Sequence, residues 1–146
     1  RFEESEAEVV KYYRGFIYLY FKDKRDLKRK EKLFGEWLRN KAEIIFNESL
    51  EKMYALVQKY NVKKPKLMFR TMKARWGSCL RDSHAILLNF ELIKAPKYCI
   101  DYVVLHELIH FIYKNHDNQF YSFLSALMPD WKQRKAILDE EVVREL

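Results

Sequence analysis

Hydrophobic residues recur at helical spacing in several parts of the chain. From about residue 27 to residue 60 they return every three or four positions, which predicts one long helix. The same pattern follows from about residue 97 to residue 113, where Pro96 suits the first turn of a helix. Two further helices are expected, one that holds Phe120, Phe123, Leu124 and Leu127 and is capped by Asn115 or Asp117, and one from about Trp131 to the C-terminus.

Strand patterns occupy most of the remaining chain. Residues 12–21 are rich in aromatic and branched residues around Gly15, and they predict a strand or a bent hairpin strand. Apolar and polar residues alternate over residues 67–72, which predicts a half-buried strand, and residues 84–90 predict a second strand that pairs back on it. Gly77 interrupts the pattern between them and allows a bulge or a close backbone approach. Residues 1–8 are acidic, and we expect them to be frayed or to form a short helix.

This order of elements predicts an α+β fold with a long N-terminal helix, a small antiparallel sheet and helices at the C-terminal end. The chain has 146 residues, which fits a single domain over residues 1–146 with a strand-containing N-terminal segment at residues 1–26. It begins with Arg1 rather than Met, so this segment is expected to be truncated upstream.

Composition narrows the class of protein. Apolar residues make up 49% of the chain, which is typical of a globular protein. No apolar stretch is long enough to span a bilayer, so we expect no membrane partner. Two Cys without a framework spacing indicate a reduced, cytoplasmic protein.

The net charge of +7 comes largely from two basic segments, residues 22–32 and residues 63–75. Such runs are usually solvated surfaces. The alternative interpretation is a basic face that attracts nucleic acid, nucleotides or an acidic substrate.

The candidate metal-binding and catalytic residues lie mainly in residues 106–110, which read His-Glu-Leu-Ile-His inside an apolar helical segment. Residues four apart share one face of a helix, so His106 and His110 can reach one point. A carboxylate directly after the first His can lie beside a water held at that point. This pattern is typical of zinc hydrolases, with two His ligands and, here, Glu107 as general base.

His116 is the best candidate for a third ligand. The polar turn formers at residues 114–118 can fold it back after the helix ends, and three protein ligands with an open position are typical of catalytic Zn²⁺. Asp117, Asp130 and the acids near the C-terminus are alternatives. Cys99 lies about two helical turns before His106, roughly 10 Å away, and is expected to be a small buried residue instead.

Other residues are candidates for the walls of a cleft. Arg75, Trp76, Ser78, Asn89 and Tyr113 are interpreted as substrate-cleft residues, with turn and core packing as the alternative. His84, Arg75, Tyr113 and Tyr121 are candidates for stabilising an oxyanion, and the sequence does not choose between them.

Taken together, these motifs resemble those of a known family. They include residues 70–79 with Trp76-Gly77-Ser78-Cys79, Asn89, residues 92–96, residues 101–110, residues 115–116, Phe120 and residues 128–130. In this order they are similar to the YgjP-like predicted metal-dependent hydrolases, relatives of the WLM and SprT-like zincin metallopeptidases, over roughly residues 27–138. The resemblance implies a zincin-type fold in which His106, His110 and His116 hold zinc and Glu107 is the base. Tyr121 departs from it, since many relatives have Trp there.

Three functions follow as hypotheses. The first is a zinc metallopeptidase acting on a peptide or protein substrate. The second is a metal-dependent nucleoside triphosphate pyrophosphohydrolase, in which Lys66, Lys73 or Arg75 holds the phosphates. The third is a DNA-associated, SprT-like protease whose basic face binds nucleic acid. A purely structural zinc site is a further alternative, which the adjacent Glu107 and the three-ligand count disfavour.

Overall fold

The structure, a computed structural model, describes residues 2–4, 9–13, 16–21 and 27–141. The chain divides into two compact units, residues 1–43 and residues 44–146, and each is described by itself. The helix at residues 27–57 runs through the division.

The first unit contains a three-stranded sheet. Its strands are β1 (Phe2–Glu4), β2 (Val9–Tyr13) and β3 (Phe16–Phe21), in the order β1-β3-β2. Strands β2 and β3 are antiparallel, as expected of a hairpin, whereas β1 pairs parallel with β3; Gly15 itself lies outside the described residues. The expectation of a frayed or helical start was wrong at residues 2–4, because β3 offers this segment a pairing edge that local composition does not reveal.

The long helix is confirmed as α1 (Leu27–Val57), followed by the 3₁₀ turn η1 (Gln58–Tyr60). The turn ends at Asn61, whose φ of 63° is a left-handed conformation that Asn tolerates. Within the second unit, the buried side chains of α1 follow helical spacing. They are Ile45, Phe46, Ser49, Leu50, Met53 and Val57.

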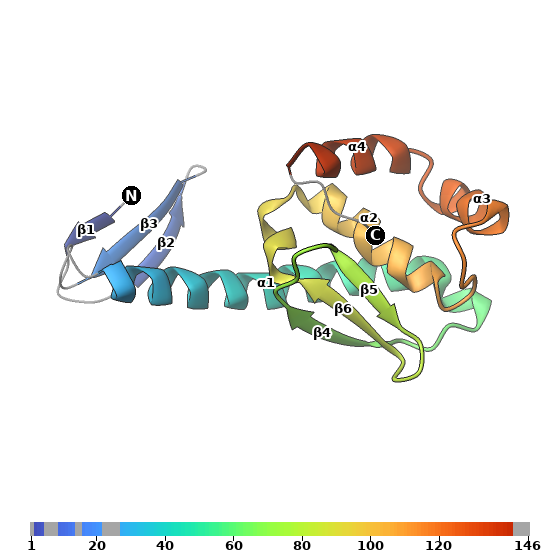
Figure 1. Cartoon of the computed structure of the whole chain (residues 1–146), viewed down its shortest axis with the longest axis horizontal. Helices are drawn as coiled ribbons and strands as arrows, with labels where there is room; N and C mark the ends of the chain where they lie inside the picture. Colours follow the sequence, from blue (N-terminus) through green and yellow to red (C-terminus); the bar gives the residue numbers. More distant parts are fainter. Residues whose placement is uncertain (1, 5–8, 14–15, 22–26, 142–146) are drawn as a thin grey trace. The chain divides into compact units, whose positions relative to one another are not determined.

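The second sheet contains β4 (Lys66–Arg70), β5 (Gly77–Leu80) and β6 (Ala85–Asn89) in the order β4-β6-β5. Strand β6 pairs antiparallel with β5 but parallel with β4, so the sheet is mixed rather than antiparallel throughout. The expected pairing of residues 84–90 back on residues 67–72 was therefore wrong in direction. The segment expected to be a bulge is the strand β5, and this strand takes the hairpin partner's place beside β6 (Figure 1).

Three helices follow the sheet after a 3₁₀ turn, η2 (Phe90–Lys94). They are α2 (Lys97–Ile109), α3 (Asn118–Leu127) and α4 (Trp131–Glu141). All three were expected, and the expected extension of α4 to the C-terminus lies outside the described residues. Asp117 caps α3, since its carboxylate accepts a 3.1 Å hydrogen bond from the Phe120 amide. Every residue of α2 from Cys99 to Ile109 is buried, which makes α2 the central helix of this unit. Among the described helices, none has both the length and the apolar character needed to cross a membrane.

The core lies between the second sheet and the helices α1 and α2. Phe69 of β4 packs on Phe46 of α1, with ring centroids 5.9 Å apart. The two helices are joined by a buried hydrogen bond of 2.7 Å from the Ser49 hydroxyl to Asp101 of α2. Lys52 adds an ion pair to the same carboxylate at 2.6 Å. These contacts hold α2, and with it residues 106–110, against one face of the sheet.

Candidate metal centre

Three histidine rings converge at the end of α2. The Nε2 atoms of His106 and His116 are 2.9 Å apart, those of His110 and His116 are 2.8 Å apart, and those of His106 and His110 are 3.3 Å apart. Of the described His, Cys, Asp and Glu residues, these three form a group that could hold a metal ion. Burial falls from His106 through the half-buried His110 to the exposed His116, so the group opens to solvent on one side.

Local structure explains the convergence. His106 and His110 lie four residues apart on α2, and the helix ends at His110. The chain then turns, and the cap at Asp117 starts α3 directly after His116. Phe120 of α3 lies against all three imidazoles, with centroid distances of 4.8, 4.7 and 5.1 Å to His106, His110 and His116. This ring supports the group from the protein side.

The surroundings of the three imidazoles disfavour their protonated forms. Burial is the main cause that lowers the pKa of each ring, and for His106 it brings the pKa to about 2. The neighbouring rings add to the effect at His106 and His110. The Nδ1 atom of His110 lies 3.1 Å from the Tyr113 carbonyl oxygen, to which it donates as N–H. This tautomer leaves the lone pair of His110 on Nε2, facing the other two rings.

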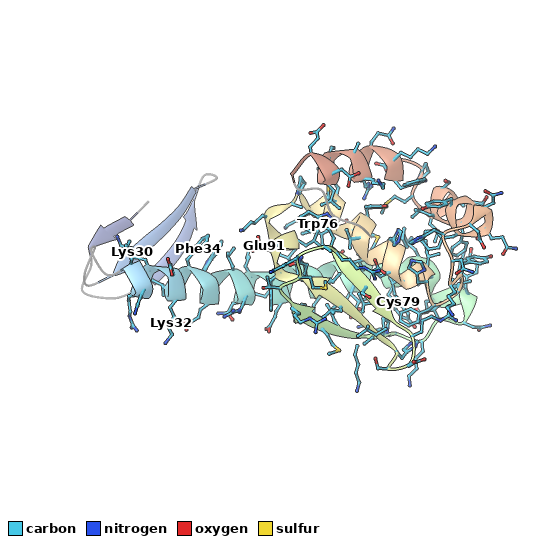
Figure 2. All side chains as sticks on the ribbon, viewed as in Figure 1. Lys30, Lys32, Phe34, Trp76, Cys79 and Glu91 are labelled. Carbon is cyan, nitrogen blue, oxygen red and sulfur yellow. The ribbon has the colours of Figure 1, made fainter. Side chains whose placement is uncertain are left out.

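Glu107 directly follows His106 on α2, and its side chain is only 2% exposed. Burial raises its pKa to about 8, while the positive charge of Arg75 and a hydrogen bond from the Cys79 amide act in the opposite direction. Cys79 is on β5 (Figure 2), so this hydrogen bond joins the strand to the helix. Among the described residues, the buried Oε2 atom of Glu107 has no hydrogen-bond partner. It is therefore available to accept a proton.

Strand β5, which forms an edge of its sheet, approaches α2 very closely at Gly77. A Cβ atom at this position would lie 3.1 Å from Val103 Cγ1, 3.2 Å from Leu88 Cδ2 and 3.3 Å from Glu107 Cγ. Few side chains tolerate contacts this short. The expected close backbone approach at Gly77 is thus observed, and it is what brings the Cys79 amide within reach of Glu107.

Among the cleft residues expected from the sequence, Arg75 carries a positive charge that affects Glu107 and His116. Its guanidinium is exposed, and its positive charge lowers the pKa of both Glu107 and His116. The segment that carries it is held by Asn89, which is fully buried. The side-chain amide nitrogen of Asn89 donates hydrogen bonds to the carbonyl oxygens of Met72, at 2.8 Å, and Arg75, at 2.9 Å. Asn89 therefore acts on the site through the backbone of Arg75.

The other cleft candidates have different surroundings. Trp76 is buried at 3% exposure, directly before β5 (Figure 2). Ser78 alternates with Gly77 and Cys79 along β5, so its side chain lies on the sheet face away from α2. Tyr113 contributes its carbonyl oxygen to His110, while its ring packs on Phe123 at a centroid distance of 5.7 Å.

The two remaining candidates for stabilising an oxyanion, Tyr121 and His84, lie in different places. Tyr121 of α3 packs beside the cluster, with its ring centroid 6.1 Å from that of His116. The ring of His84 instead lies 4.5 Å from Phe111, and its Nε2 is 2.6 Å from the carbonyl oxygen of Lys63. These contacts fix the β5–β6 turn rather than the histidine cluster.

Arg81 is a site-supporting residue that the sequence did not indicate. It lies in the turn between β5 and β6, and its guanidinium donates a 2.9 Å hydrogen bond to the carbonyl oxygen of His110. Its charge also contributes to lowering the pKa of the His110 ring. Since this contact joins residues 29 positions apart, no local pattern could have revealed it.

The family model described as "YgjP-like, metallopeptidase domain" matches residues 1–141. No curated protein gives a significant match. Among solved structures, the metallopeptidase zymogen of Pyrococcus abyssi, abylysin, is similar with a TM-score of 0.62 and 16% identity, covering 69% of this chain and 98% of that one. The metallopeptidase zymogen of Methanocaldococcus jannaschii, jannalysin, has a TM-score of 0.56 and 19% identity, covering 66% and 95%. At these identities the structures confirm the expected fold class.

Proposed function

Because this chain belongs to the YgjP-like metallopeptidase family, we propose that it is a zinc-dependent peptidase with Glu107 as its general base. The observation that carries the proposal is the meeting of three imidazole nitrogens on and directly after the helix α2, which also carries the buried Glu107 carboxylate directly after His106. The family and the fold lend no support to the nucleotide or nucleic-acid alternatives.

The three histidines fit a metal ion. Zinc bound at about 2.0–2.1 Å to three tetrahedrally placed nitrogens requires those nitrogens to be about 3.3 Å apart. The Nε2 atoms are 2.8–3.3 Å apart, so a shift of a few tenths of an ångström accommodates the ion. Three nitrogen donors favour zinc over magnesium or calcium, which prefer oxygen ligands. His106, His110 and His116 would hold it.

When bound, zinc would supply a Lewis acid that polarises the scissile carbonyl and makes an attacking water more acidic. The residues of this chain do the rest. Glu107 takes the proton of the attacking water on Oε2 while the Cys79 amide holds the other side of the carboxylate in place. Glu107 then delivers the proton to the leaving amine.

Arg75 is the residue we assign to the negative charge that develops on the carbonyl oxygen. Its guanidinium acts electrostatically on both Glu107 and His116, so it borders the place where the reaction occurs. An extended substrate can approach along β5, since this strand forms an edge of its sheet and overlooks Glu107.

The test compares the zinc-loaded wild type with Glu107→Gln on a broad library of quenched fluorescent peptides. We expect the variant to bind zinc as the wild type does, because the three ligands are intact, and to lose turnover by about 10²–10⁴-fold. Removing zinc with a chelator should abolish activity, and adding it back should restore activity. Glu48→Gln, an exposed residue on α1, is the matched control and should keep full activity.

Two outcomes would contradict the proposal in different ways. Full activity in Glu107→Gln would refute the assigned base while leaving the peptidase intact. A zinc-loaded wild type that cleaves no peptide in the library would refute the peptidase function itself.

A further inference from the structure

A surface cavity of about 860 Å³, wide open to solvent, lies between α3 and α4, in the same unit as the histidine cluster. Its lining includes Tyr121 and Trp131, together with Lys132, Lys135 and Asp139 of α4. No step of the proposed mechanism uses these side chains. These side chains are therefore available to contact a part of a bound molecule that does not itself react.

An aromatic wall connects this cavity with the metal cluster. The rings of Tyr121 and Trp131 stack with centroids 5.3 Å apart and an interplanar angle of 24°. The Trp131 ring is held in place because its N–H donates a 2.9 Å hydrogen bond to the Ser125 hydroxyl. Tyr121 also lies beside His116, at a centroid distance of 6.1 Å. A molecule bound at the histidines therefore has this wall directly beside it.

The cavity carries a positive charge. Lys135 forms an ion pair of 2.9 Å with Asp139, which neutralises one of the two lysines. Lys132 has its ammonium 5.7 Å from the centroid of the Trp131 ring, and among the residues whose side chains are described it has no carboxylate partner. Its charge is left for a ligand. The charge of Lys135 reaches the cluster as well, since it helps to lower the pKa of His106.

We infer that this cavity binds a carboxylate of a peptide substrate next to the scissile bond, with Lys132 as its cationic partner and the Tyr121–Trp131 wall against its aliphatic part. The inference rests on the proposed peptidase function and adds a specificity to it. The carboxylate has two possible sources, an internal acidic side chain or the C-terminus of the peptide. Both offer the same anionic group on a short carbon chain.

The experiment measures peptide binding to the zinc-loaded Glu107→Gln protein by calorimetry, so that it does not require turnover. Glu is placed in turn at each position of a short, neutral, C-terminally amidated peptide, and Gln at the same position is the reference. A Gln peptide with a free C-terminus distinguishes the second source. We expect one Glu position, or the free C-terminus, to raise affinity about three- to fivefold, which fits one solvent-exposed ion pair.

In the same Glu107→Gln background, Lys132→Gln should abolish this preference. Lys59→Gln is the matched control and should keep the preference, because Lys59 also lies over an aromatic ring, that of Tyr60 at 5.4 Å, but away from this cavity on η1. Equal affinity for Glu and Gln at every position, together with no gain from a free C-terminus, would overturn the inference. So would inorganic pyrophosphate that displaces the preferred peptide at equal concentration, since this would indicate a phosphate site.

Turnover of the same peptides by the protein with Glu107 intact separates the two proposals. Cleavage that is indifferent to the carboxylate refutes the cavity assignment alone. No cleavage, combined with a Lys132-dependent preference in binding, supports the cavity assignment and refutes the peptidase function.

Discussion

The guanidinium of Arg81 donates a 2.9 Å hydrogen bond to the carbonyl oxygen of His110. It thereby ties the β5–β6 turn to the end of the helix that carries two of the three clustered histidines. Because α2 ends at His110, this carbonyl lacks a partner within a continuing helix. Arg81 thus stabilises both the helix end and the position of the His110 ring.

We expect Arg81→Gln to weaken zinc binding about tenfold, as is typical when a residue that orients a metal ligand is lost. Competition with a chromophoric chelator measures the affinity. Arg134→Gln is a matched control, because Arg134 donates a 3.1 Å hydrogen bond to the Tyr98 carbonyl at the opposite end of α2. That variant should keep wild-type zinc affinity. If both variants lose affinity equally, the effect is a general loosening of α2 rather than the positioning of His110.

The close contact of β5 with α2 leads to a second prediction. Gly77→Ala places a methyl group 3.1–3.3 Å from side-chain atoms of Val103, Leu88 and Glu107. The neighbours must move, so we expect a loss of about 1–3 kcal/mol in the free energy of unfolding, as is typical for overpacking. Urea denaturation measures it. The peptidase rate should fall as well, because the strand that donates the Cys79 amide to Glu107 is displaced.

Gly35→Ala is the control for this substitution. No heavy atom lies within 4 Å of a Cβ built at Gly35, which is in α1. Alanine is favoured over glycine inside a helix by about 0.5–1 kcal/mol, so this variant should be slightly more stable than the wild type. A Gly77→Ala variant as stable as Gly35→Ala would show that β5 moves away from α2 without cost.

Local spacing was enough to predict the helices and the three clustered histidines. His106 and His110 share a helix face by periodicity alone, and His116 follows from a short polar turn between α2 and α3. Interactions of this kind join residues close in sequence, so they can be predicted without the tertiary structure. The metal-binding role of the three histidines stays a prediction.

Strand partners and side-chain contacts between distant segments could not be predicted in this way. Residues 84–90 were expected to form a strand, now seen as β6, but their sequence does not reveal whether the partner is β4 or β5, or in which direction each runs. For the same reason, the hydrogen bond from the Cys79 amide to Glu107 and the contact of Arg81 with His110 were not expected. Both require β5 to lie beside α2, which depends on Gly77 and on the core beneath it.

Asn89 leads to a third prediction. This residue is fully buried, and its amide nitrogen donates to the carbonyl oxygens of Met72 and Arg75. Asn89→Ala leaves both carbonyls without this donor, so we expect a loss of about 2–4 kcal/mol in the free energy of unfolding. Where the variant is still folded, kcat should fall because the segment that carries Arg75 is no longer fixed. Thermal unfolding and peptide turnover measure the two effects.

A comparison with Tyr54→Phe separates stability from positioning. The Tyr54 hydroxyl donates a 2.7 Å hydrogen bond to the Val62 carbonyl oxygen, and the loss of this bond should cost about 1 kcal/mol. The segment that carries Arg75 is not affected. If kcat in Asn89→Ala is unchanged at a temperature where the protein is folded, Asn89 stabilises the fold without positioning Arg75.

The raised pKa of Glu107 predicts that the free energy of unfolding of the metal-free protein depends on pH. Its pKa is raised by burial from an ordinary value of 4.5 to about 8, so the folded state binds its proton more tightly than the unfolded state does. Below pH 4.5 the carboxyl is protonated in both states and there is no penalty. As the pH rises through about 8, the cost of the buried charge grows to its full value, on the order of a few kcal/mol.

Glu107→Gln removes this ionisation, so the metal-free variant should be more stable than the metal-free wild type at pH 9 and nearly equal to it at pH 4. Denaturant unfolding with a chelator present at each pH measures the difference. Glu48→Gln, at an exposed position of α1, should change stability by less than about 0.5 kcal/mol. A gain from Glu107→Gln that is the same at both pH values would mean that the amide packs better than the carboxyl, and that the folded protein does not hold the Glu107 proton.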